Sequence, residues 1–168
     1  MTSPDTTIRQ QGEGDKRWFF GGGLHTWKAT AEETGGAFLC FEDHMEAGKV
    51  TPFHTHPGAD EAFYVLEGEI VVHADGEEHP LRAGGFAVAL RGVPHAFMTS
   101  TETRLLCWQT PGTGQAFFHH ASEPADGRGI DGPVDFARVQ ASAQEHGGVE
   151  ILGPPPFAGA PGAAAVGS

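Results

Sequence analysis

The stretch GKVTPFHTHPGADEAFYVLEG, residues 48–68, decides the fold, because it places His54, His56 and Glu61 close together. Residues i and i+2 of a β-strand point to the same face, so the imidazoles of His54 and His56 lie side by side. Residues 57–60 are of the turn-forming type, which lets the chain reverse and start a second strand at Glu61. The pattern therefore predicts two short strands that bring three metal-binding side chains together.

A second stretch, GGFAVALRGVPHAFMT at residues 84–99, adds His95 on a strand 34 positions beyond Glu61, with Phe97 on the same strand face. Three imidazoles and one carboxylate suit a borderline divalent cation, namely Fe(II), Mn(II), Co(II), Ni(II), Cu(II) or Zn(II). Four protein ligands on a metal that tolerates five or six leave open positions, where chemistry takes place. The sequence thus predicts one transition-metal ion per chain and leaves its identity open.

The two stretches resemble the two motifs of the cupin superfamily. The first motif is matched at every fixed position: Gly48, His54, His56, Glu61 and Gly68. The second is matched at Gly84, Gly92 and His95, whereas Leu90 stands in place of the usual Pro and Thr99 in place of a frequent Asn. The resemblance implies an all-β double-stranded β-helix, or jelly-roll barrel. It also implies that the matching histidines and glutamate, His54, His56, Glu61 and His95, are the metal ligands.

More narrowly, residues 34–70 and the late stretch HGGVEILGPPP, residues 146–156, resemble flavonol (quercetin) 2,3-dioxygenases. This resemblance implies a metal-dependent dioxygenase that cleaves an enolic or phenolic, flavonol-like aromatic substrate with O2. Glu61 is then the candidate catalytic group, because a carboxylate beside the metal can accept the enol proton. Two alternatives stay open. One is a non-redox lyase, isomerase or polyketide cyclase, and the other is a cupin that binds a small molecule without turnover.

Phe63 and Phe97 share strand faces with metal ligands, and we expect them to line an apolar substrate pocket that excludes water. His25 and His44 lie on other strands that enter the barrel and are candidate neighbours of the metal ligands. Glu42 and Asp43 point to opposite faces of one strand, so one of them faces inward and is a candidate base.

The composition excludes several classes of partner. The 168 residues carry a net charge of −12, which is the wrong sign for nucleic acid or an anionic membrane. Cys40 and Cys107 lie in apolar strand-like runs and are expected to be reduced, buried thiols. Apolar runs stay short of the roughly 18 residues of a membrane span, and the first residues lack a signal pattern. We therefore expect a cytoplasmic protein.

Short segments of strand-like pattern, spaced as in a sandwich or barrel, cover the middle of the chain. They are 18–20, 24–30, 37–45, 68–74, 77–81, 86–90, 94–99 and 104–110. Asp75-Gly76 predicts a tight hairpin turn, and residues 122–133 read as a linker. An amphipathic pattern predicts one short C-terminal helix over 136–146, ended by Gly147.

The domain prediction is a single cupin domain over 16–157, with disordered residues 1–15 and 158–168 on either side. His119 and His120 are predicted on a surface strand. Single cupin domains often pair through sheet edges, so we expect a homodimer. The apolar residues expected at its interface are Trp18, Phe19, Phe20, Phe117 and Phe118.

Overall fold

The computed structural model describes residues 5–158, so residues 1–4 and 159–168 of the two predicted disordered ends lie outside the described residues. Residues 5–15 form neither a strand nor a helix. They are nevertheless attached to the rest of the chain, because the Arg9 guanidinium donates a 2.6 Å hydrogen bond to the Glu33 carboxylate.

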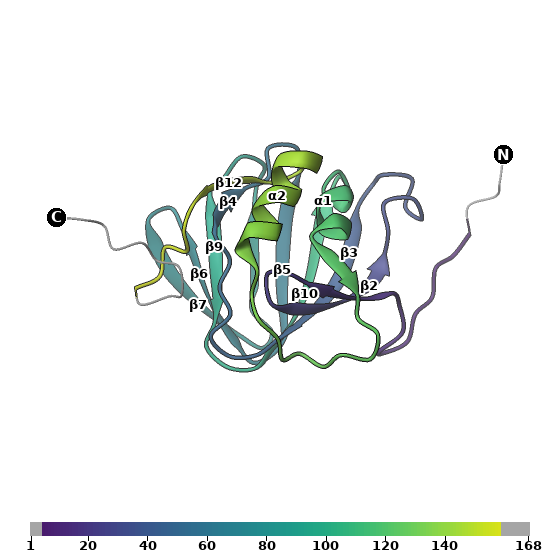
Figure 1. Cartoon of the computed structure of the whole chain (residues 1–168), viewed down its shortest axis with the longest axis horizontal. Coiled ribbons are helices and arrows are strands. Elements are labelled where there is room, and N and C mark those ends of the chain that lie inside the picture. Colours follow the sequence, from purple (N-terminus) through teal and green to yellow (C-terminus); the bar gives the residue numbers. More distant parts are fainter. Residues whose placement is uncertain (1–4, 159–168) are drawn as a thin grey trace.

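Two antiparallel sheets form the body of the protein, which confirms the predicted all-β jelly-roll barrel (Figure 1). The larger sheet has the order β11-β1-β2-β3-β10-β5-β8. Its strands are β11 (Ser122–Pro124), β1 (Lys16–Phe19), β2 (Gly23–Ala29), β3 (Leu39–Met45), β10 (Thr103–Thr110), β5 (Asp60–Glu67) and β8 (Phe86–Ala89). The smaller sheet has the order β12-β4-β9-β6-β7. Its strands are β12 (Glu150–Gly153), β4 (Phe53–Thr55), β9 (His95–Thr99), β6 (Glu69–Ala74) and β7 (Glu77–Arg82).

Strand alternation sorts the side chains between the core and the outside. On β3, Leu39, Phe41, Asp43 and Met45 are buried while the residues between them are partly exposed. The two sheets turn their apolar faces toward each other, as a sandwich requires. Leu39 and Leu105 from the larger sheet and Ile70 from the smaller one are almost fully buried in the resulting core. The predicted hairpin is present, since β6 pairs with β7 across Asp75 and Gly76.

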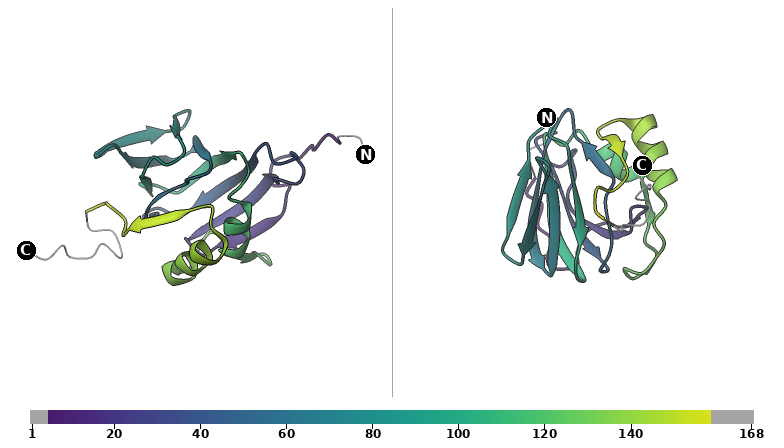
Figure 2. Two further views of the ribbon diagram at one scale, coloured as in Figure 1. Left: turned by 90° about the horizontal axis from the view of Figure 1, so that it is seen from above. Right: turned by 90° about the vertical axis from the view of Figure 1, so that its left-hand side faces the viewer.

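Two helices lie together at one side of the barrel (Figures 1 and 2). The helix predicted over 136–146 is α2 (Phe136–His146), capped by the Asp135 carboxylate, which accepts from the Arg138 backbone N–H. Neither helix within residues 5–158 has the length and apolar character needed to cross a membrane.

The strand predicted around His119 and His120 is wrong, because Gln115–His120 forms the helix α1. Adjacent residues on a strand point to opposite faces, whereas adjacent residues on a helix lie about 100° apart. The helix therefore buries both Phe117 and Phe118 while both histidines stay exposed. The linker prediction is also wrong in part, because β11 occupies Ser122–Pro124 and pairs with β1.

Four of the five residues predicted to form a dimer interface are buried within the chain, and Phe19 is partly buried. Trp18 and Phe20 are 3% and 5% exposed, and Phe117 and Phe118 are buried in the same core. The prediction for residues 18–20 fails because β1 lies inside the larger sheet, between β11 and β2.

Gly68, the last fixed residue of the first motif, joins β5 to β6 at a φ of +84°. A Cβ atom there would collide with the backbone carbonyl of Glu102 and crowd Thr103 Oγ1. We expect Gly68→Ala to cost about 2–4 kcal/mol of unfolding free energy, since left-handed strain and overpacking add. Gly84→Ala, at a φ of +87° but with open space around it, should cost only about 1–2 kcal/mol. Urea denaturation of both variants measures the difference, and equal losses would contradict the steric argument.

Candidate metal centre

The four predicted ligands come from three neighbouring segments of the barrel. His54 lies on β4 directly opposite His95 on β9, and His56 follows the end of β4. Glu61 is the second residue of β5 in the larger sheet. Both sheets thus contribute, and the turn at 57–60 carries the chain from one to the other.

The side chains converge on one point inside the barrel. One ligand atom from each of His54, His56, Glu61 and His95 lies within 4.8 Å of all the others, and all four residues are buried. Glu61 Oε2 lies 2.9 Å from Nε2 of both His56 and His95, and 3.9 Å from Nε2 of His54. At these distances, the three Nε2 atoms and one carboxylate oxygen surround a common point, the focus of the site.

Each of the three histidines is oriented through its other ring nitrogen. Nδ1 of His54 lies 2.8 Å from the carbonyl of Pro52, and Nδ1 of His95 lies 3.0 Å from that of Val93. Nδ1 of His56 lies 2.9 Å from the carbonyl of Gly148, in the turn after α2. A carbonyl only accepts, so each Nδ1 carries the proton and each Nε2 keeps its lone pair toward the focus.

The second carboxylate oxygen of Glu61 is held by residues that the sequence did not single out. Gln109 on β10 pairs in register with Glu61, and its Nε2 donates to Glu61 Oε1 over 3.0 Å. The Cys107 thiol lies 3.6 Å from the same oxygen. The available sequence signal was an amide at the position that continues the apolar alternation of Leu105 and Cys107. Gln109 therefore orients the carboxylate so that Oε2 faces the histidines.

The electrostatics favour a charged Glu61 carboxylate and shift the pKa values of two of the facing histidines in opposite directions. Burial alone would raise the pKa of Glu61, but the facing His56 and hydrogen bonds from the histidines outweigh it and hold this pKa well below its ordinary value. Burial lowers the pKa of His54. Burial would also lower the pKa of His56, but the Glu61 charge outweighs it and raises this pKa. A carboxylate and unprotonated imidazoles are the forms that bind metal.

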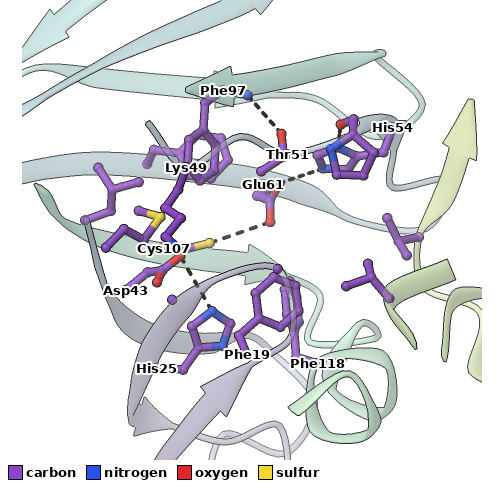
Figure 3. A pocket seen from close by; sticks show the side chains of 18 of the residues that line it. Phe19, His25, Asp43, Lys49, Thr51, His54, Glu61, Phe97, Cys107 and Phe118 are labelled. Carbon is purple, nitrogen blue, oxygen red and sulfur yellow. Dashed lines mark hydrogen bonds and ion pairs between the residues drawn. The ribbon is translucent and has the colours of Figure 1, made fainter. Parts of the chain in front are cut away.

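A pocket adjoins the four-residue cluster and runs into the barrel (Figure 3). Its walls are mainly apolar and include the predicted pocket residues Phe63 and Phe97, whose rings meet edge to face at 5.4 Å between centroids. His25 and Asp43 face the same pocket. Glu42 instead points out and pairs with Arg104 at 2.7 Å. Cys40 and Cys107 are both free thiols, the first half-buried and the second buried.

The residues present fit a divalent metal ion. Three oriented imidazole nitrogens and one carboxylate oxygen, all buried and close together, are a donor set suited to a first-row transition metal. The cluster could therefore bind such an ion, next to the pocket that His54, His56 and Glu61 also line.

The fold and the site define a barrel of the cupin type. Residues 41–109, which span β3 to β10 and contain all four candidate ligands, match the Cupin domain family. This part of the chain is a cupin domain.

The relatives of the chain agree with this assignment. Quercetin 2,3-dioxygenase of Bacillus subtilis (strain 168) is 30% identical over 121 residues, which make up 71% of this chain and 36% of that protein. The chain thus aligns with about a third of that relative.

Two solved structures share the fold. A predicted oxalate decarboxylase from Thermotoga maritima matches 63% of this chain and 99% of its own, with a TM-score of 0.56 and 23% identity. An RmlC-like cupin from Shewanella frigidimarina matches 64% of this chain and 93% of its own, with a TM-score of 0.57 and 19% identity. At these identities, the likeness shows the barrel alone.

Proposed function

We propose that the protein is a metal-dependent dioxygenase that cleaves an enolic or phenolic aromatic substrate of the flavonol type with O2. The observation that carries the proposal is the position of the four converging ligand atoms at one end of an apolar, aromatic-walled pocket. The similarity to a quercetin 2,3-dioxygenase supports the reaction class, although it covers only 36% of that relative.

In this proposal, His54, His56, Glu61 and His95 hold the ion. When bound, the metal would favour the enolate form of the substrate through its Lewis acidity, and it would supply redox chemistry or charge stabilisation for the reaction with O2. In the same proposal, Glu61 Oε2 accepts the enol proton; the Gln109 hydrogen bond to Oε1 supports this choice of oxygen. Phe63 and Phe97 pack against a flat substrate and exclude water from the reacting carbon.

An oxygen electrode tests the reaction class. Metal-loaded protein mixed with a flavonol should consume O2 in proportion to product, and the metal-free protein should consume none. Product formed at full rate without O2 uptake would reject the dioxygenase and favour a lyase, isomerase or polyketide cyclase at the same site. Tight binding without product would favour a small-molecule-binding cupin.

The protein also forms a homodimer in this proposal, through the outer face of β8 and not through the aromatic residues of β1 and α1. Phe86, Val88 and Leu90 are 52%, 50% and 60% exposed. Tyr64 pairs with Phe86 in register, and Trp108 lies 5.7 Å from the Phe86 ring. Among the described strands, β8 is the last of the larger sheet and has a free edge. An apolar patch beside an open edge is suited to a second copy of the chain.

Val88→Lys should convert the dimer to a monomer, because a lysine at a sheet edge must lose its hydration to be buried against a partner. Light scattering should give twice the 17.7 kDa chain mass for the original protein and 17.7 kDa for the variant. Leu152→Lys, which adds the same charge at a 45% exposed position of β12, is the matched control and should remain dimeric. A 17.7 kDa particle for the original protein at micromolar concentration would contradict the dimer.

A further inference from the structure

The pocket has a second polar pair, separate from the four candidate metal ligands. His25 on β2 and Asp43 on β3 are opposite one another in register, 1% and 6% exposed. Both line the pocket that also reaches His54 and Glu61. Figure 3 shows them on one side of the pocket, with Glu61 and His54 on another side and Cys107 between.

The His25 ring is held in a fixed plane. It stacks on Phe19 with 4.7 Å between ring centroids and on Phe41 with 4.1 Å, at interplanar angles of 18° and 22°. The ring therefore has little freedom to turn toward another partner. A preorganised polar group of this kind is what a specific binding site needs.

Both residues keep a buried polar atom without a hydrogen-bond partner among the described residues, namely His25 Nδ1 and Asp43 Oδ1. Their mutual contact, from His25 Nε2 to Asp43 Oδ2, is 3.5 Å and so longer than an ordinary hydrogen bond. An unpaired buried polar group costs free energy, and a buried carboxylate costs most. A ligand that brings O–H or N–H groups to this pair would offset that cost.

Gly23 lets the Asp43 carboxylate pack closely against the backbone of β2. A Cβ atom at residue 23 would collide with Asp43 Oδ1 and crowd the Met45 side chain. Gly23 and Asp43 both line the pocket, so a side chain at residue 23 would displace the carboxylate from its position there.

The two polar groups of the pocket lie on opposite flanks of β10. Asp43 pairs with Leu105 on one flank, and Glu61 pairs with Gln109 on the other. A ligand that contacts both carboxylates therefore reaches from one side of the pocket to the other.

We propose that His25 and Asp43 are positioning residues. The Asp43 carboxylate accepts a hydrogen bond from a hydroxyl group at the end of the aromatic substrate remote from the metal, and His25 holds that carboxylate through its other oxygen. The inference rests on the proposed function for the metal-binding end and names the substrate class more narrowly. The substrate is a multi-ring aromatic that chelates at one end and carries a phenolic hydroxyl at the other.

Two probes that differ only in the remote hydroxyl test this inference, 3-hydroxyflavone and 3,4′-dihydroxyflavone. Their dissociation constants are measured on the full chain under argon, so that O2-dependent turnover does not intervene. We expect the dihydroxy probe to bind roughly 10- to 100-fold more tightly, the factor that a hydrogen bond to a charged group supplies. In Asp43→Asn the preference should fall to roughly threefold or less.

Two further variants separate positioning from stability. His25→Phe keeps the aromatic stack and removes both nitrogens. Gly23→Ala displaces the Asp43 carboxylate without replacing either polar residue. Both should lose the preference for the remote hydroxyl while thermal unfolding shows a folded protein. Glu42→Gln and His44→Gln change the neighbouring residues of β3, which face outward to Arg104 and Glu102, and should keep the preference.

Equal affinity of the original protein for the two probes, or failure to bind either, would overturn the inference. So would a preference that survives in all three pocket variants. These outcomes are distinct from failure of the proposed function. A preference that depends on Asp43, without O2 uptake, leaves the positioning role intact and rejects only the dioxygenase.

Discussion

Replacing either His54 or His56 by Ala should remove most of the bound metal from the protein. Each imidazole supplies one of four converging donors and is held in place by a backbone carbonyl, so its loss leaves three donors and an open side. We expect metal affinity to fall more than 100-fold, since loss of an outer partner of a ligand alone costs about 10- to 100-fold. Metal content per chain, measured by elemental analysis after desalting, reports the effect.

The matched control is His44→Ala, because His44 lies on the outside of the same barrel and pairs with Glu102 at 2.9 Å. Its metal content should equal that of the original protein. Circular dichroism should show the barrel in all three variants, because the core is built from apolar residues of both sheets. Full metal occupancy in both His54→Ala and His56→Ala would rule out the assignment of the ligands.

Glu61→Gln should lower turnover of the flavonol substrate by about 100- to 10,000-fold, the range associated with loss of a general acid or base. The amide has nearly the same shape as the carboxylate and still offers an oxygen, but it carries no charge and accepts no proton at neutral pH. The low pKa of Glu61 means that the group removed is the ionised carboxylate. Initial rates of O2 uptake, measured with metal content in the same samples, test this prediction.

The parallel metal measurement separates two roles of Glu61. Retained metal with lost turnover assigns a proton-accepting role, whereas loss of both assigns a ligand role. Glu67→Gln is the control on the same strand, because Glu67 points outward to Arg104 and should leave both quantities unchanged. Turnover of Glu61→Gln equal to that of the original protein would contradict any essential role of the carboxylate.

The fold was largely predictable because a barrel of this type is encoded in local patterns. Three of these patterns depend on only a few neighbouring residues. They are the alternation of buried and exposed residues on β3 and β10, the hairpin turn at Asp75-Gly76, and the left-handed conformation of Gly48, Gly68, Gly84 and Gly92. The prediction failed at Gln115–His120, where aromatic residues favoured a strand but burial of Phe117 and Phe118 against the barrel required a helix.

The candidate site was predictable only in its residue types. The i, i+2 spacing of His54 and His56, together with the turn before Glu61, predicts three metal-binding side chains. The second motif adds His95. Gln109 gave a weak signal, because nothing in its own segment shows that it lies opposite Glu61. That pairing depends on the register between two strands that are more than 40 residues apart in the chain.

The sequence by itself therefore determined the cupin barrel and the four side chains that could hold a metal, because strand period, turn chemistry and motif spacing are local properties. Only the tertiary structure decided how these side chains are oriented. The carbonyls of Pro52, Val93 and Gly148 turn the three Nε2 atoms to one focus, and Gly148 reaches His56 from a segment 92 residues away. The same holds for His25 and Asp43, whose place in the pocket follows from how β2 and β3 face the opposite sheet. Contacts between distant segments are set by packing of the whole barrel, and no short stretch of sequence contains that information.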